Sequence, residues 1–284
     1  MELGRSRQTL SSLLGVDSSR IESLGVEDRL IASDRDRFID PFLLPRSEHR
    51  EMREAYVTLQ THMDRAFEVI KDSVTNCVVT DQRQLTPKEL AERAMRDLEF
   101  SSKKDWLFSH FVAPEAKEIA CGYAKDNNAG TGIGEESARA IVNQAARLFA
   151  LGIGDATCLI TLPCLPSHVG PDRLSDLIAS VIRPHTEVFT ARIVDEILEG
   201  VVAHRRKACR DRVRNSGIHV LPSDVLCELS SAEKALESVL KGQAIATNSM
   251  YYSRKSAGRR LDVEMNAVLF QAITNELSKS KLQT

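Results

Sequence analysis

Apolar residues recur at every third or fourth position over several stretches of the chain, and this spacing predicts a mainly helical protein. The clearest stretch runs from about residue 48 to residue 73. Its apolar stripe consists of Met52, Ala55, Tyr56, Leu59, Met63, Ala66, Phe67 and Ile70. Charged residues fill the opposite face, so we expect a long amphipathic helix whose apolar stripe packs against the rest of the fold.

Further helices are indicated by their ends as well as by their periodicity. Thr86-Pro87-Lys88-Glu89 has the form of a capping box with proline in the first helical turn, and it predicts a helix start. Another helix is expected after Gly134, ending at Gly152. The remaining predicted helices cover about residues 171–182, 186–206, 223–240 and 262 onwards.

Strands are expected to be few and short, at residues 121–123, 156–166 and 218–221, with loops near 76–84 and 243–256. For residues 156–166 the periodicity also allows a short helix. Two prolines, at 41 and 45, keep the residues before them away from helical geometry, so residues 1–45 are predicted to form an extended N-terminal arm. Residues 46–284 then form a mainly helical globular domain with a candidate subdivision near residue 215. The predicted fold class is mainly α with a few short strands (α+β), a helical core with that arm.

Composition limits the partners and the cellular location of the protein but indicates no reaction. The 284 residues carry a formal net charge of −2, so attraction to nucleic acid would have to come from a local patch. No apolar run approaches the roughly 18–20 residues that span a bilayer, and the N-terminus lacks a signal-peptide pattern. The six cysteines form no C-x-x-C pair and are expected to be buried and reduced. A cytoplasmic protein without membrane contact is predicted.

A glycine-rich loop precedes the helix expected after residue 134. Gly130, Gly132 and Gly134 alternate with other residues, and such a loop can aim backbone N–H groups at an anion. The spacing differs from the dinucleotide-binding fingerprint, and no Lys-Ser or Lys-Thr follows as in a phosphate-binding Walker loop. Two interpretations remain: a structural helix entry, and the binding loop of a nucleotide or anion sensor.

Carboxylates gather in the segment Val169-Gly170-Pro171-Asp172-Arg173-Leu174-Ser175-Asp176. Asp172 and Asp176 are four residues apart and share a helix face, with Ser175 between them. Such a pair could bind Mg²⁺ or Mn²⁺ and activate water against a phosphodiester, with Asp40 as a third carboxylate and Ser175 orienting water or phosphate. The alternative is structural, because acids are favoured in a first helical turn. No other cofactor is predicted.

A run of cations follows at the end of the helix predicted over residues 186–206. It consists of Arg205, Arg206, Lys207, Arg210, Arg212 and Arg214, interrupted by the acid Asp211. Some of these cations are expected to interact favourably with the negative end of the helix dipole at the C-terminus, an effect that is limited to the last turn. The cations in excess of this need predict contact with nucleic acid or with an acidic protein face. If the partner is nucleic acid, Tyr251, Tyr252 and the cations that follow them are expected to contribute to the same surface.

Four blocks of the chain are similar to a group of uncharacterised bacterial proteins found among mobile-element and phage-defence genes. The blocks are Phe38–Leu44, Gly122–Tyr123, Val169–Asp176 and Leu221–Leu226. The resemblance implies a bacterial, intracellular setting and a protein partner from the same system, but no reaction. Three hypotheses follow: a regulatory module that binds a partner or nucleic acid, a metal-dependent nucleic-acid phosphodiesterase, and a nucleotide or anion sensor.

Overall fold

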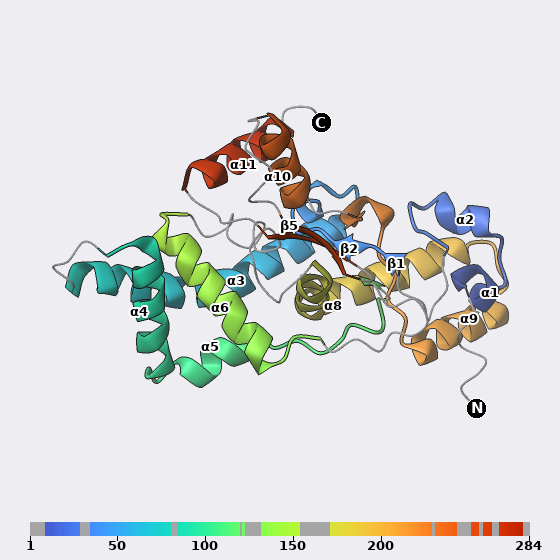
Figure 1. The fold of residues 1–284 in the computed structure, drawn as a ribbon. Helices are drawn as coiled ribbons and strands as arrows, with labels where there is room; N and C mark the ends of the chain where they lie inside the picture. Colours follow the sequence, from blue (N-terminus) through green and yellow to red (C-terminus); the bar gives the residue numbers. More distant parts are fainter. Residues whose placement is uncertain are drawn as a thin grey trace. The chain divides into compact units, whose positions relative to one another are not determined.

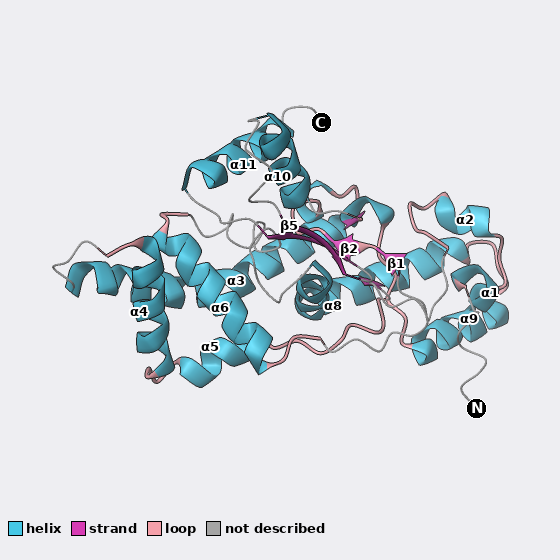
Figure 2. Ribbon diagram, in the orientation of Figure 1, coloured by secondary structure: helices cyan, strands magenta, loops and turns pink. Residues whose placement is uncertain are grey.

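Helices dominate a computed structural model of the chain (Figures 1 and 2), which confirms the predicted fold class. The structure describes residues 9–28, 35–80, 85–119, 121–122, 132–153, 171–228, 231–242, 251–255, 258–262 and 267–280. Contacts divide the chain into two units. Unit 1 contains Met1–Leu59, Glu115–Thr131 and Ile178–Glu228, and unit 2 contains Gln60–Pro114, Gly132–Leu177 and Leu229–Thr284. The predicted boundaries near residues 45 and 215 are not among these divisions, and they stay a prediction about domains.

Unit 1 combines short N-terminal elements with parts of the long helices. In chain order it contains α1 (Leu10–Leu14), α2 (Ser18–Glu22), β1 (Arg35–Asp36), β2 (Phe38–Ile39), the 3-10 turn Leu44–Arg46, the start of α3 (Arg50–Thr80), β3 (Cys121–Gly122), most of α8 (Pro171–Ile197), α9 (Ala203–Ser216), the 3-10 turn Ser223–Val225 and β4 (Leu226–Cys227). Strand β1 pairs with β3 in parallel, and β2 pairs with β4 antiparallel. Helix α1 packs against α9.

Unit 2 is built from helix pairs. It contains the rest of α3, α4 (Pro87–Glu99), α5 (Lys104–His110), α6 (Glu135–Ala150), the start of α8, α10 (Ser231–Gly242), β5 (Tyr251–Lys255), β6 (Gly258–Asp262) and α11 (Ala267–Ser280). Helix α6 packs on α4 and α5, α10 packs on α11, and β5 and β6 form an antiparallel hairpin. Phe67, Phe111 and Phe149 are buried together in the part of this unit formed by α3, α5 and α6.

The long helices differ from their predicted bounds. Helix α3 runs to Thr80, so residues 76–80 are helical rather than a loop. Helix α8 continues from Pro171 to Ile197 through Pro184, where two helices were predicted. Proline at this position removes the N–H that would bond the carbonyl of Ser180. Ser180 is exposed, so water can bond that carbonyl and the helix does not have to end.

The basic run lies on a helix of its own, which corrects the expectation that it ends a long one. Helix α8 ends at Ile197, and α9 starts at Ala203 after a turn in which Gly200 has a φ of 81°. Such a positive φ is readily adopted by glycine, which explains the break. The six cations therefore line a separate 14-residue helix.

Residues 218–228 also depart from the prediction of a strand followed by a helix. Residues 218–221 form no strand, because their N–H groups bond elsewhere: His219 donates to the carbonyl of Glu118, and Val220 donates to Thr190 Oγ1. Asp224 does not cap a helix of its own. Its carboxylate accepts hydrogen bonds from the Ser47 hydroxyl and the Glu48 N–H, and α10 begins only at Ser231.

The two ends of the chain hold further corrections. Residues 10–14 and 18–22 of the predicted arm are helical, because Thr9 and Asp17 cap them. Residues 251–255 form strand β5 rather than a loop, and the last helix starts at Ala267 rather than near 262. The strand at 121–122 is confirmed, while the strand predicted over 156–166 lies outside the described residues.

The described residues bear on two expectations, the lack of a membrane-spanning helix and the burial of the cysteines. Within these residues, no helix combines the length and the apolar character needed to cross a bilayer. Cys77, Cys121, Cys209 and Cys227 are free thiols and buried, as predicted. Cys158 and Cys164 fall outside the described part of the chain.

Candidate functional site

Helix α9 is mostly exposed, although it belongs to the packed part of unit 1. Only Cys209 and Val213 are buried among its 14 residues. The Cys209 thiol donates to the carbonyl of Leu14 over 3.4 Å, which fixes α9 against the end of α1. A helix held by so narrow a strip leaves most of its circumference to solvent or to a partner.

The cations of α9 form two rows on either side of its outward face. Lys207, Arg210 and Arg214 are spaced by three and four residues, so they share one side of the helix. Arg205 and Arg212 are seven residues apart and share the other side. All five side chains are exposed, and the sixth cation, Arg206, is half-buried and donates to the carbonyl of Val201.

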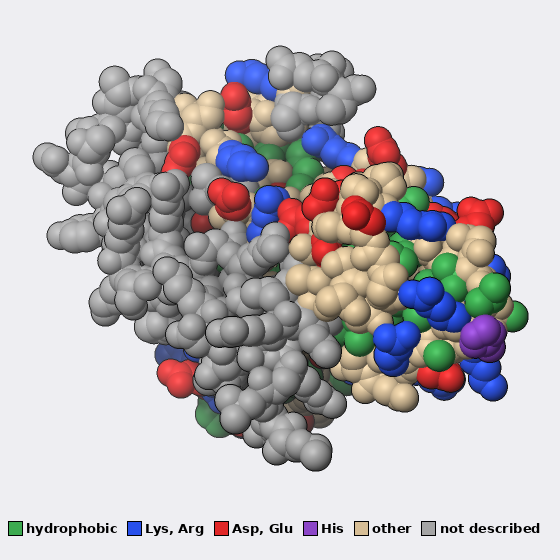
Figure 3. Space-filling model, turned by 90° about the vertical axis from the view of Figure 1, so that its right-hand side faces the viewer, with side chains coloured by type: hydrophobic (Ala, Val, Ile, Leu, Met, Phe, Trp, Pro, Cys, Tyr) green, Lys and Arg blue, Asp and Glu red, His purple; other side chains and the backbone are tan. Residues whose placement is uncertain are grey.

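Three of the six cations have no partner within the described part of the chain. Arg210 pairs with Asp195 of α8, and Arg212 donates to the carbonyl of Ala208 and to Cys209 Sγ. The side chains of Arg205, Lys207 and Arg214 make no hydrogen bond or ion pair with described residues. Figure 3 views the molecule from the side on which Figure 1 draws α9, and both Lys or Arg and Asp or Glu side chains are visible there.

A cavity of about 710 Å³ lies in unit 1 between α8 and α9. Its charged and polar lining includes Arg183, Glu187 and Thr190 from α8, Arg210 and Arg214 from α9, and His219 from the segment that follows. Val194, Val213 and Ile218 give it an apolar part. The sequence did not predict this cavity, because its walls come from three segments whose pairing depends on the tertiary fold.

The residues of the predicted metal site are buried, lie in the first turns of α8 or stabilise a turn of the backbone. Ser175 and Asp176 are buried, and Asp172 lies in the first turn of α8, where the helix dipole favours a carboxylate. Asp40, in unit 1, is 2% exposed and accepts the N–H of Phe42 over 2.9 Å, which stabilises the turn after β2. Among the described residues, no group of three or more His, Cys, Asp or Glu side chains could hold a metal ion. Metal-assisted catalysis by Asp172, Asp176, Ser175 and Asp40 stays a prediction.

The segment of Asp172 and the glycine loop meet in unit 2. Arg173 Nη1 donates to Ser137 Oγ over 2.7 Å, which ties the first turn of α8 to the first turn of α6. Of the three glycines, Gly134 is the N-cap of α6, Gly132 has a φ of 57°, and Gly130 lies outside the described residues. This bond links the two helices that begin at these motifs.

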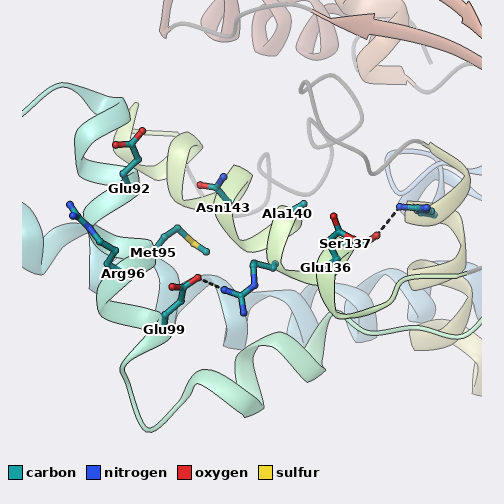
Figure 4. A pocket seen from close by; sticks show the side chains of 10 residues that line it. Glu92, Met95, Arg96, Glu99, Glu136, Ser137, Ala140 and Asn143 are labelled. Atoms are coloured by element: carbon teal, nitrogen blue, oxygen red, sulfur yellow. Dashed lines mark hydrogen bonds and ion pairs between the residues drawn. The ribbon is translucent and has the colours of Figure 1, made fainter.

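A second cavity, of about 760 Å³, lies beside the first turns of α6 in unit 2 (Figure 4). Its charged residues are balanced: Arg96, Arg139 and Arg173 against Glu92, Glu99 and Glu136. Arg139 pairs with Glu99 across the cavity. Glu135 and Glu136 already place negative charge at the N-terminus of α6, where an anion would bind. The anion-sensor hypothesis for this loop stays a prediction.

Sequence reasoning missed a histidine pair in unit 2. The rings of His62 and His110 are stacked with centroids 3.7 Å apart and planes 12° apart. Each ring Nε2 lies in hydrogen-bond range of the other residue's backbone carbonyl, at 3.1 and 2.7 Å. A carbonyl only accepts, so both Nε2 atoms carry hydrogen. The residues are 48 positions apart, and no sequence spacing would have indicated the pair.

The histidine pair predicts that the protein loses stability in mild acid. Burial lowers the pKa of both rings below their usual 6.5, and repulsion from Arg65 adds to it. At these two histidines the unfolded chain therefore binds protons more readily than the folded chain does. The pair leaves the free energy of unfolding unchanged above about pH 6.5 and lowers it as the pH drops below that value. Urea unfolding at pH 7.5 and 5.5 measures this difference.

Glutamine keeps an N–H donor but does not titrate, so it separates protonation from packing. The double variant His62→Gln/His110→Gln should lose less stability between pH 7.5 and 5.5 than the wild type. The variant His204→Gln, at an exposed position of α9, serves as the control and should behave as the wild type. Equal losses in the double variant and the wild type would contradict this prediction.

Comparison with known proteins gives one match. Residues 89–208 match the model of a family described as a domain of unknown function (DUF8370), which covers less than half of the chain. The match spans α4, the glycine loop, the segment of Asp172 and the first residues of α9. No curated protein and no solved structure matches the chain.

Proposed function

We propose that this chain is a nucleic-acid-binding module of a bacterial phage-defence or mobile-element system, with a regulatory rather than a catalytic role. The observation that carries the proposal is helix α9, an exposed helix with six cations, one acid and three cations without a partner among the described residues. The setting rests on the sequence resemblance described above. A protein partner from the same system is part of the proposal.

The dimensions and chemistry of α9 suit the phosphate backbone of duplex DNA. Fourteen helical residues extend about 21 Å, and an α-helix fits the major groove, which is about 12 Å wide. The two rows of cations flank the outward face, so each can contact one of the two phosphate chains beside the groove. Helix α9 has no Phe, Tyr or Trp on which an unpaired base could stack. We therefore expect binding with little sequence preference and a strong dependence on salt.

The test reverses two unpaired charges of α9 that lie outside the cavity. The variant Arg205→Glu/Lys207→Glu should bind a fluorescein-labelled 20-base-pair DNA duplex at least about tenfold more weakly at 100 mM salt. The slope of log affinity against log salt should become shallower by about 2, because two phosphate contacts are lost. Both side chains are exposed, so the unfolding temperature should not change. Fluorescence anisotropy from 50 to 200 mM salt measures affinity and slope.

A control variant with the same change in net charge distinguishes a local contact from general repulsion. Lys88 and Lys103 are exposed residues of unit 2, and both lie at helix N-termini, where glutamate is tolerated. The variant Lys88→Glu/Lys103→Glu should bind DNA nearly as well as the wild type. Equal losses in the two variants, or no binding by the wild type at 50 mM salt, would overturn the proposal. Binding to an acidic protein but not to DNA would reassign α9 to a partner.

A further inference from the structure

The cavity between α8 and α9 has the size and the mixed lining of a small-molecule site. Its volume of about 710 Å³ falls within the roughly 300–1,000 Å³ that is usual for ligand pockets. Its apolar residues come from α8, α9 and the segment that follows α9, and charged residues from both helices also line it. Ligand binding in this cavity does not require that α9 binds DNA.

The tautomer of His219 follows from the hydrogen bonds around it. Thr186 Oγ1 donates its one hydrogen to the carbonyl of Arg183 over 2.8 Å. It must therefore accept from His219 Nδ1, which lies 3.0 Å away. Nδ1 then carries the ring hydrogen, and in the neutral ring Nε2 is an acceptor. Burial lowers the pKa of His219 below its usual value, against the opposing effect of Glu118 and Glu187, and this favours the neutral form.

Two acceptors then lie close together at the cavity, His219 Nε2 and Glu187 Oε1, of which Oε1 also accepts a hydrogen bond from Arg183 Nε over 3.4 Å. His219 is 8% exposed, and its Nε2 forms no hydrogen bond with a described residue. The nearest charged atom given for it is Glu187 Oε1, 3.8 Å away. A ligand amino group has two hydrogens and could donate one to each atom. His219 is thus a buried residue that lines the cavity and whose Nε2 has no hydrogen-bond partner among the described residues, which makes it the strongest indication of a ligand.

The α9 side of the cavity is suited to an anion. Arg210 and Arg214 are one turn apart on α9 and both line the cavity, and Arg183 lines it from α8. The two acids among the lining residues, Glu187 and Asp195, leave an excess of one positive charge when His219 is neutral. Arg214 has no partner among the described residues, so it can bind an anion without breaking a contact. A phosphate group matches the planar fork of arginine.

We propose that this cavity binds a nucleoside monophosphate whose base carries an amino group. The amino group donates to His219 Nε2 and Glu187, the base packs on Val194, Val213 and Ile218, and the phosphate binds Arg210 and Arg214. Arg210 and Arg214 also belong to the exposed rows of α9, so the nucleotide would compete with nucleic acid for them.

Matched nucleotides test the amino group directly by isothermal titration calorimetry. AMP should bind at least about tenfold more tightly than IMP, which lacks the amino group, and CMP more tightly than UMP. Inorganic phosphate and adenosine should each bind more weakly than AMP, because each has only one of the two parts. Equal affinities for AMP and IMP, or no heat from any nucleotide at millimolar concentration, would overturn the proposal.

Variants locate the binding in this cavity. His219→Ala and Arg214→Gln should each weaken AMP binding at least about tenfold. Glu187→Gln should do so as well, and since Glu187 is 56% exposed this variant tests the site without disturbing the core. Arg205→Gln, on α9 but outside the cavity, should bind AMP like the wild type. AMP binding that is unchanged in Glu187→Gln and Arg214→Gln would place the nucleotide elsewhere.

The same variants separate this proposal from the DNA contact. Arg205→Glu/Lys207→Glu should lose DNA and keep AMP, while Glu187→Gln should lose AMP and keep DNA. If DNA binding fails but AMP binding follows the pattern above, only the proposed function is overturned.

Discussion

Replacing Phe67 by alanine is expected to lower the free energy of unfolding by about 3–5 kcal/mol. Phe67 is 1% exposed on α3, and its ring contacts Phe149 edge-on at 5.8 Å and Phe111 at 6.3 Å between centroids. Alanine would leave a cavity where α5 and α6 pack on α3, and it would remove both ring contacts. Urea denaturation followed by circular dichroism measures the loss.

An exposed residue of the same helix provides the control for this variant. Val79 lies three turns further along α3 and is 78% exposed. Val79→Ala removes no buried contact and should change the free energy of unfolding by less than about 0.5 kcal/mol. A loss below about 1 kcal/mol in Phe67→Ala would mean that the three rings do not form the core of unit 2.

Elements whose signals are local in sequence were predicted well. Of the eight stripe residues expected on α3, seven are buried and Tyr56 is half-buried. The capping box at the start of α4 is present, with Glu89 N–H donating to Thr86 Oγ1 and Thr86 N–H donating to Glu89 Oε2. Both signals depend on residues within one or two turns, so no tertiary contact is needed to interpret them.

Elements whose outcome depends on distant residues were predicted poorly. A helix break was predicted between residues 182 and 186, but the exposure of Ser180 allows α8 to continue through Pro184. A helix was predicted to start near residue 223, but the Asp224 carboxylate accepts the N–H of Glu48 just before α3, 176 residues away in the sequence. A local pattern cannot show whether water or a distant group will satisfy a hydrogen-bonding atom, and this decided both cases.

The positive charge of the candidate site on α9 was predicted from the sequence, but the arrangement of its residues and the cavity beside it were not. The cations of residues 205–214 were recognised from their clustering along the sequence, while their two rows depend on where α9 begins. His219 was known only as one of seven histidines. Its importance follows from Thr186 and Glu187, which lie more than 30 residues away and are brought to it by tertiary packing.

Replacing Arg192 by alanine is expected to lower the free energy of unfolding by about 2–3 kcal/mol. Arg192 holds Glu51 in unit 1 through two hydrogen bonds, Nε to Oε1 at 2.6 Å and Nη2 to Oε2 at 3.2 Å. Its guanidinium also lies over the buried ring of Phe189 and pairs with Glu196. Without Arg192, Glu51 keeps a carboxylate that is only 12% exposed and lacks its main donor. Arg192 itself is 36% exposed, so water partly compensates and the loss stays below the about 3–5 kcal/mol of a fully buried pair.

Arg50 provides the matched control, because it forms an ion pair on the same turn of α3 but in solvent. Its partner is Glu54, and the two side chains are 82% and 48% exposed. Arg50→Ala should change the free energy of unfolding by no more than about 0.5 kcal/mol.

The dependence of stability on acid gives a second measurement of the Arg192–Glu51 pair. The hydrogen bond from Arg192 lowers the pKa of Glu51. The stabilisation by this pair is therefore present above about pH 4.5 and is lost as the pH falls further. Arg192→Ala should therefore lose less stability than the wild type between pH 5 and pH 3, and similar acid responses of the two proteins would show that this pair does not stabilise unit 1.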